Sequence, residues 1–229
     1  MREGFAIAID GPVAAGKGTL ASKLAEELHG FYLYTGAMYR CLALECINRG
    51  VAIDDEAAVE QVLPFVSIRF EGTKTFLNDV DVTERIQASD AANGASVVSV
   101  DPKVREDAVR KQQAIAKKAI RKGEIVVAEG RDTGTRVLPD AKLKIYLTAT
   151  PEVRAKRRLA QFVNQGRQVD YEHVLAEVQE RDERDKGRET DPLPSNPEDL
   201  GYVILDDSQM SEEETLGVIK KELQRRELV

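Results

Sequence analysis

The sequence predicts an α/β protein in which helices flank a central parallel sheet. Short apolar runs bounded by turn residues alternate along the chain with longer helical stretches, a pattern typical of strands joined by crossover helices. The first two runs, 5–9 and 125–128, are continuously apolar, as expected for strands covered on both faces. A glycine-rich turn follows the first run directly. We therefore expect the remaining elements to alternate in the same way.

Each further element follows from its own pattern. Apolar runs at 143–147 and 202–205 complete a set of four predicted strands. Helices are predicted at 18–28, 36–48, 103–121, 151–164 and 212–226. One segment breaks the alternation, because the runs 66–70 and 75–82 flank a glycine-containing turn at 71–74. That arrangement predicts an antiparallel hairpin inserted beside the main sheet.

A charged stretch near the carboxyl end of the chain is expected to lie outside the core. Residues 181–191 carry nine charges in eleven positions and precede Pro192, Pro194 and Pro197. Dense charge followed by helix breakers is typical of a solvated, mobile surface loop.

Composition disfavours several classes of protein. The 229 residues, 42% of them apolar and 32% charged, are enough for one globular domain with a substantial core. With 33 basic and 40 acidic side chains the net charge is −7, which argues against a nucleic-acid-binding protein. The longest stretch without a charged residue, 28–39, has twelve residues and is too short to span a bilayer.

The cysteines and the start of the chain point to a cytoplasmic protein. Cys41 and Cys46 lie five positions apart, which matches neither a redox C-x-x-C motif nor a zinc pattern. The apolar run near the start is too short for a signal peptide. We therefore expect buried, reduced thiols, no zinc site and no membrane segment.

The glycine-rich turn has the pattern of a phosphate-binding P-loop. Its nine residues follow a strand and open a helix, the context that this motif requires. In order they are Gly11, Pro12, Val13, Ala14, Ala15, Gly16, Lys17, Gly18 and Thr19. Glycines let successive backbone N–H groups point at one anion, and the positive end of the helix dipole lies behind them. Lys17 adds a formal charge that can reach the β- and γ-phosphates.

Two features of this loop leave alternatives open. The hydroxyl that ligates Mg²⁺ in a P-loop directly follows the lysine, whereas here Gly18 intervenes and Thr19 comes one position later. Thr19 is therefore a candidate for a direct metal contact, a contact through water, or a contact to a phosphate oxygen. Gly16, Gly18 and Ala21 also match the dinucleotide fingerprint, but 36–40 holds no acidic residue for the ribose.

Several arginines go beyond what a nucleoside-triphosphate site needs. Arg131 and Asp132 directly follow the second buried strand, and open α/β sheets bind ligands at the carboxyl ends of their strands. Thr35 stands at a predicted helix start, with Arg40 one turn further in. Three more follow the third strand, namely Arg154, Arg157 and Arg158. This surplus of cations indicates a second phosphate-bearing ligand.

Together these segments resemble the bacterial cytidylate kinase family, whose members transfer phosphate from ATP to CMP or dCMP. The resemblance covers nearly the whole chain, including the hairpin insertion. The matching segments are 10–19, 35–40, 130–135 and 181–188. The resemblance implies one P-loop kinase domain over 1–229, with a monophosphate-binding region at about 34–102. It also implies a short helical lid with a following charged segment at about 152–190.

The resemblance also assigns roles to residues. It implies that the loop from Gly11 to Thr19 holds the ATP phosphates. The implied catalytic groups are Lys17, Arg131 and the lid residues Arg154, Arg157 and Arg158. The implied CMP site comprises Thr35, Arg40 and Arg131 at the phosphate, Ser96, Arg105 and Asp132 at the cytosine edge, Arg181 and Asp185 at the sugar, and Arg188 near phosphate and base.

The chemistry of phosphoryl transfer is compatible with this residue set. Its transition state spreads charge over the moving phosphoryl group, so the protein mainly aligns the reactants and stabilises charge. The acceptor phosphate oxygen is already ionised, and we expect Asp132 to serve recognition rather than base catalysis. Mg²⁺ is the expected cofactor because ATP is the phosphate donor. The lid arginines and residues 181–191 are expected to become ordered when both nucleotides bind.

Some alternatives stay open at this point. Tyr34 stands where the family often has Asp, and Thr133 where it usually has an aliphatic residue, so nucleotide preference can differ. A P-loop kinase acting on AMP, GMP or shikimate is the nearest rival. A regulatory GTPase is disfavoured because the chain lacks an N-K-x-D motif. We expect a monomer that acts on free mononucleotides, with CMP, dCMP and UMP preference undecided.

Overall fold

A five-stranded parallel sheet forms the centre of the fold. The computed structural model describes residues 3–164 and 166–229, and its main strands stand in the order β2-β6-β1-β7-β8. Their bounds are β1 Ala6–Asp10, β2 Phe31–Tyr34, β6 Val126–Gly130, β7 Leu143–Thr148 and β8 Val203–Asp206. Every neighbouring pair is parallel. The first strand therefore lies in the middle of the sheet, and its carboxyl end shares one edge with its neighbours.

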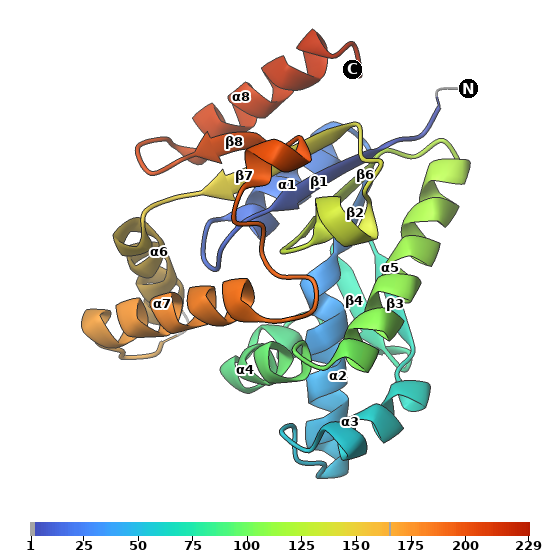
Figure 1. The fold of residues 1–229 in the computed structure, drawn as a ribbon, viewed down its shortest axis with the longest axis vertical. Coiled ribbons are helices and arrows are strands. Elements are labelled where there is room, and N and C mark those ends of the chain that lie inside the picture. Colours follow the sequence, from blue (N-terminus) through green and yellow to red (C-terminus); the bar gives the residue numbers. More distant parts are fainter. Residues whose placement is uncertain (1–2, 165) are drawn as a thin grey trace.

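Helices cover both faces of the sheet, as Figure 1 shows. On one face, α1 (Lys17–Glu27) and α8 (Glu212–Arg225) pack over alternate residues of the strands, including Ile9. On the other face, α5 (Pro102–Arg121) packs over Ala6 and its neighbours in β6. All residues of β1 and β6 are buried, which explains their apolar sequences. The predicted α/β fold with a central parallel sheet is confirmed.

Strand β2 is the element of the main sheet that the sequence patterns did not reveal. Its four residues read Phe-Tyr-Leu-Tyr, and only Leu33 among them is fully buried. Because β2 lies at the edge of the sheet, next to β6 alone, its sequence is not continuously apolar. A run of four residues directly before a helix therefore gave too little pattern to identify it.

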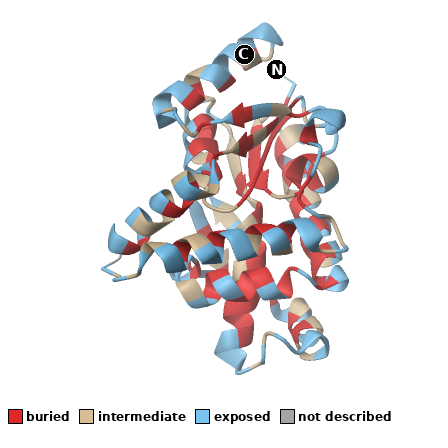
Figure 2. Ribbon diagram, turned by 60° about the vertical axis from the view of Figure 1, so that its left-hand side comes forward, coloured by how far each residue is buried: buried red, intermediate tan, exposed pale blue. Residues whose placement is uncertain are grey.

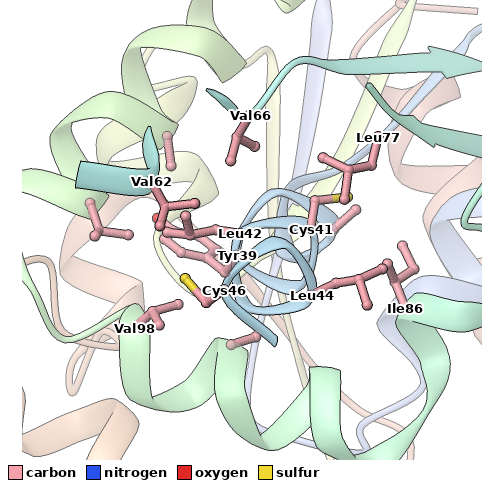
Figure 3. Close-up of a cluster of buried hydrophobic side chains, with 14 of the residues drawn as sticks. Tyr39, Cys41, Leu42, Leu44, Cys46, Val62, Val66, Leu77, Ile86 and Val98 are labelled. Carbon is pink, nitrogen blue, oxygen red and sulfur yellow. The ribbon is translucent and has the colours of Figure 1, made fainter. Parts of the chain in front are cut away.

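A second core lies beyond the carboxyl edge of the sheet and is enlarged in Figure 3. Helix α2 runs through it, and Cys41, Leu42 and Leu44 contact side chains from the surrounding elements. Around α2 (Thr35–Arg49), those elements include α3 Glu56–Val62, β3 Ile68–Glu71, β4 Lys74–Leu77 and α4 Ser89–Val98. Strand β5 (Val80–Asp81) is exposed and lies outside this core. Cys41 and Cys46 are free and buried, as the sequence predicts.

The inserted hairpin has three strands rather than two. Strands β3, β4 and β5 form a separate antiparallel sheet in that order. The predicted strand 75–82 is divided after Leu77, because Asn78 and Asp79 have φ angles of 49° and 65°. Two consecutive residues with positive φ form the tight turn of a hairpin, and Asn and Asp tolerate that conformation better than most side chains.

Helices α6 (Pro151–Asn164) and α7 (Tyr171–Gly187) lie side by side, at the lower left of Figure 1. A small core between them includes Ala155, Phe162 and Val174. Figure 2 shows that much of their remaining surface is exposed or half-buried. Within the described ranges, we find no helix long and apolar enough to cross a membrane.

The expectation of a solvated loop at 181–191 is wrong for its first seven residues. Residues 181–187 continue helix α7, and both Asp182 and Asp185 are buried. Three residues apart on a helix, these carboxylates share one face. Asp182 pairs with Arg154 at 2.7 Å, and Asp185 pairs with Arg131 at 2.6 Å. The dense charge therefore serves internal pairing, which compensates for its removal from water.

One buried carboxylate connects three parts of the fold. Asp10, the last residue of β1, is fully buried. It accepts hydrogen bonds from the backbone N–H groups of Thr133 and Gly134, at 2.8 and 2.7 Å, and from the Tyr202 hydroxyl at 2.7 Å. Thr133 and Gly134 open the short π-helical segment η3 (Thr133–Val137), and Tyr202 directly precedes β8. The carboxylate thus holds the loop after β6 against the end of β1.

We expect Asp10→Ala to destabilise the fold strongly. The substitution leaves two buried backbone donors and a phenol without an acceptor, at a cost of about 3 kcal/mol or more in the free energy of unfolding. Tyr202→Phe, the matched control, removes a single donor and should cost about 1 kcal/mol. Urea denaturation followed by circular dichroism measures both. A loss in Asp10→Ala no larger than that in Tyr202→Phe would contradict this role.

Candidate active site

A cavity of about 410 Å³ opens along the carboxyl edge of the main sheet. Its walls come from the loop after β1, the starts of α1 and α2, helix α4, the end of β6 and helix α7. Of the site residues predicted from the sequence, all but four line this cavity. The four exceptions among the described residues are Gly11, Pro12, Arg154 and Arg157.

The loop after β1 has the backbone geometry of an anion cradle. Gly11 lies so close to β7 that a Cβ atom there would stand 2.0 Å from the Leu147 carbonyl oxygen. Gly16 caps α1 with a φ angle of 88°, which other residues rarely adopt. Helix α1 begins at Lys17, so its free N–H groups and the positive end of its dipole face the cavity.

The ammonium group of Lys17 is positioned to bind an anionic group in the cavity. Its ammonium group donates a hydrogen bond to the Pro12 carbonyl at 2.7 Å. Burial, and then the nearby charge of Arg131, lower the pKa of Lys17 to about 7. Glu129, at the end of β6, also lines the cavity, and burial raises its pKa. Sequence reasoning missed Glu129, although its place directly after an apolar strand was a usable signal.

A cluster of arginines faces the loop from β6 and α7. Arg131 donates to Asp185 at 2.6 Å. Burial opposes ionisation of Asp185, but the charges of Arg131 and Arg181 outweigh it and keep the pKa of that carboxyl below its usual value. The buried Nε of Arg181 has no hydrogen-bond partner among the described residues. Burial and the charge of Arg131 lower the pKa of Arg181 to about 10. Such a guanidinium is suited to an anionic ligand.

The start of α2 supplies further polar groups to this part of the cavity. The Thr35 hydroxyl donates to the Glu129 carbonyl at 2.7 Å, which ties α2 to β6. Arg40 donates to the Ile86 carbonyl at 2.7 Å and lies 5.7 Å from the centre of the Tyr34 ring. Tyr34 and Tyr32 stack with ring centres 6.4 Å apart, and both line the cavity. This aromatic pair was not expected to form part of the site.

A second charged cluster lies at Asp132. Arg105, whose side chain is only 1% exposed, donates to Asp132 at 2.5 Å. Arg188 lies 3.7 Å from the other carboxylate oxygen of Asp132. Burial raises the pKa of Asp132, and these two cations oppose that effect. The predicted base-contacting residue Ser96 belongs to the same region. Arg105 donates to the Ser99 carbonyl, and the Ser99 hydroxyl donates to the Ser96 carbonyl.

Asp191 supports this cluster and was not predicted. Its carboxylate lies 3.3 Å from Nε of Arg105 and 3.4 Å from Nε of Arg136. Its carbonyl accepts from Nε of Arg188 at 2.7 Å. The residue has a φ angle of 49°, a conformation uncommon for any residue other than glycine. Asp191 therefore orients two of the arginines that surround Asp132.

The three predicted lid arginines have different surroundings. Arg158 lines the cavity and lies over the Phe162 ring. Arg154 pairs with Asp182 and donates to the Val13 carbonyl at 3.1 Å. Arg157 pairs with Asp207 at 2.9 Å and donates to the Ala15 carbonyl at 3.4 Å. The structure thus brings Arg158 to the cavity, whereas Arg154 and Arg157 connect the loop to its supports.

A metal-binding cluster of three or more His, Cys, Asp or Glu side chains is not found in residues 3–164 and 166–229. Asp10 does not line the cavity of the described chain, and its oxygens already accept three hydrogen bonds. Thr19 and Glu129 do line the cavity. They fit a cation whose remaining ligands are phosphate oxygens and water, which is how Mg²⁺ is held with nucleotides.

The parallel sheet, the anion-binding loop with its lysine, and the facing arginines define a P-loop phosphotransferase. Comparison with known proteins gives the family, since a family model described as cytidylate kinase matches residues 7–225. The chain belongs to the cytidylate kinase family and is a nucleoside monophosphate kinase. The predicted resemblance is confirmed.

Individual relatives agree with this assignment. A cytidylate kinase from Caldanaerobacter subterraneus subsp. tengcongensis is 44% identical over 210 residues, which cover 92% of this chain and 90% of that protein. One from Bacillus pumilus is 40% identical over 223 residues, 96% of each. A solved structure of an uncharacterized protein from Eubacterium ventriosum has a TM-score of 0.53 at 14% identity, covering 96% of this chain and 98% of that one. That similarity concerns the fold alone.

Because the pKa of Lys17 is about 7 in the protein alone, nucleotide binding should take up protons. Phosphate oxygens favour the charged ammonium and raise its pKa, so at pH 8 a mostly neutral Lys17 becomes protonated. Calorimetric titration with MgATP in two buffers of different ionisation enthalpy measures the uptake. We expect about one proton per site. Lys17→Arg, which stays charged, should take up far fewer, and equal uptake in both proteins would contradict the assignment.

Proposed function

We propose that the enzyme transfers the terminal phosphoryl group of ATP to CMP or dCMP, producing ADP and CDP or dCDP. The observation that carries this proposal is the single cavity that contains both the loop with Lys17 and the cluster around Arg131 and Asp132. Two anionic ligands can be held there with their phosphates facing each other. In-line transfer requires that alignment.

On the ATP side, the loop from Gly11 to Thr19 surrounds the phosphates with backbone N–H groups, and Lys17 neutralises their charge. Lys17 need only exchange the Pro12 carbonyl for a phosphate oxygen. Glu129 and Thr19 are the protein groups that hold Mg²⁺, directly or through water. The ion lowers the charge repulsion between the reacting phosphates.

On the acceptor side, Arg131, Arg40 and Thr35 hold the phosphate of the nucleoside monophosphate. The partnerless Nε of Arg181 supports this, since a bound nucleotide gives that buried donor an acceptor. Asp185 orients Arg131 through their ion pair and accepts a hydrogen bond from a sugar hydroxyl, while Arg181 donates to a sugar oxygen. No covalent intermediate is needed, because the acceptor oxygen is already ionised.

The base is recognised at the cluster of Asp132, Arg105 and Ser96. Cytosine presents an amino donor beside two acceptors, N3 and O2. An ionised carboxylate accepts from the amino group, while a guanidinium and a hydroxyl donate to the acceptors. Arg188 closes this part of the site, because it lies near Asp132. A purine monophosphate presents a different edge and a larger ring.

Two parts of the single domain serve these steps. Residues of about 34–102 form the region that binds the monophosphate, and residues of about 152–190 form the lid. Within the lid, Arg158 faces the transferring phosphate, whereas Arg154 and Arg157 hold the loop from outside. We also propose that the enzyme is a monomer acting on free nucleotides in the cytoplasm. The free buried thiols fit a reducing compartment.

A substrate panel tests the proposal. We expect ADP production from MgATP with CMP and dCMP, and little with UMP, AMP or GMP, each supplied alone in a coupled spectrophotometric assay. Turnover with a purine monophosphate instead would support a nucleoside monophosphate kinase activity. It would contradict the assignment of Asp132, Arg105 and Ser96 as the residues that recognise cytosine. Absence of turnover with all five nucleotides would contradict the proposed reaction.

Arg131→Ala tests the role of the central arginine. Because Arg131 stabilises charge that develops during transfer, we expect its loss to lower kcat by about a hundredfold or more. Arg110→Ala is the matched control, since Arg110 is 72% exposed on α5 and does not line the cavity of the described chain. Thermal melting identifies any loss of fold. Near-normal kcat in Arg131→Ala would exclude the assigned role.

A further inference from the structure

The hydroxyl of Ser96 has a cation on its outer side. Ser96 is 6% exposed and lines the cavity from helix α4. Arg184 of helix α7 donates a hydrogen bond from Nη1 to the Ser96 oxygen at 2.8 Å. Among the described residues, Arg184 is not part of the cavity wall. It therefore reaches the hydroxyl from a different direction than a bound nucleotide would.

Arg184 is itself held in this position. Its Nη2 donates to Glu180 at 2.7 Å, one helical turn earlier in α7. The side chain of Arg184 is 38% exposed, so part of its charge remains hydrated. The contact joins α7 to α4, two helices that approach each other in Figure 1. Arg184 itself belongs to neither the loop with Lys17 nor the cluster around Asp132.

The hydrogen bond from Arg184 limits the ability of the Ser96 hydroxyl to accept a second hydrogen bond. A serine hydroxyl has one proton to donate and two lone pairs that accept. Arg184 occupies one lone pair, and its positive charge weakens the other as an acceptor. No described residue receives the Ser96 proton in a hydrogen bond, so the O–H can point into the cavity. The hydroxyl is thereby left mainly as a donor.

A donor at this position distinguishes two pyrimidines. Cytosine has acceptors at N3 and O2, whereas uracil carries a proton at N3 and has the acceptor O4 in place of the cytosine amino group. Ser96 and Arg105, linked through Ser99, are two donors beside the acceptor Asp132. With uracil, one of these donors faces an N–H group. A mismatch of that kind leaves buried polar groups unpaired, which weakens binding substantially.

We propose that Arg184 is a positioning residue that makes the enzyme select CMP over UMP, by keeping the Ser96 hydroxyl as a hydrogen-bond donor. The proposal rests on the proposed function, in which Ser96 contacts the base. Arg184 acts only through Ser96 and touches neither nucleotide. Its removal should therefore change the choice between bases and leave the transfer step itself intact.

The test compares kcat/KM for CMP and for UMP in Arg184→Met, which keeps an unbranched but shorter side chain without the donors. We expect the CMP-to-UMP ratio to fall about tenfold, the size expected for one hydrogen bond to a charged group. The fall should come mainly from a higher KM for CMP, with kcat little changed. Arg184→Lys keeps a charged donor and should retain most of the preference. Lys186→Met removes an exposed charge from the same helix and should leave the ratio unchanged.

A double mutant separates this role from a structural one. If Arg184 acts through Ser96, then Ser96→Ala lowers the ratio by the same factor, and Arg184→Met adds nothing in the Ser96→Ala background. Additive losses, an unchanged ratio in Arg184→Met, or a fall in kcat alone would overturn the proposal. These outcomes leave the proposed function standing. If the unaltered enzyme fails to phosphorylate CMP, the proposed function is overturned, and this inference with it.

Discussion

The buried carboxylate of Asp10 sets the distance between the two halves of the candidate active site. Asp10 ends the central strand, and the residue after it begins the loop that carries Lys17. Its oxygens accept from the two N–H groups that directly follow Asp132, and from the Tyr202 hydroxyl. A carboxylate with three donors in a dry interior has essentially one stable position. The loop after β1 and the loop after β6 are consequently held as one unit. The groups that bind the phosphates of the two nucleotides are therefore already positioned to face each other.

The buried charges around this unit are mostly paired with one another. Most of its buried cations have an internal partner, as in the pairs of Arg154 with Asp182 and Arg131 with Asp185. These pairs also tie helix α7 to helix α6 and to the residue that follows β6. Lys17 and Arg181 differ, because Lys17 donates to a neutral carbonyl and Nε of Arg181 has no partner in the described chain. The positive charge that is left uncompensated is concentrated where phosphates are expected, although the chain as a whole is acidic.

Two positions depart from the residues usual in the family, and their surroundings differ. Tyr34 replaces a frequent Asp, and its ring stacks with Tyr32 and lies beneath Arg40. The site therefore contains one negative charge fewer near the phosphates than a chain with Asp would have. Thr133 replaces a usual aliphatic residue, and its hydroxyl is buried without a hydrogen-bond partner among the described residues. Nothing in the structure explains why a hydroxyl is found there.

The sequence by itself determined the elements whose patterns are local. Strand β1, the loop that follows it and the place of Arg131 after a buried strand could be predicted, because burial on both faces imposes continuous apolarity and an anion cradle needs glycines at set spacings. Only the tertiary structure decided what depends on contacts between distant segments. It placed β2 at the sheet edge, turned 181–187 into a helix with buried carboxylates, paired Arg154 with Asp182 and Arg157 with Asp207, and joined Arg184 to Ser96. Charged residues have similar sequence patterns whether they face water or one another. The partner that decides between the two lies 50 to 90 positions away, and no local pattern contains it.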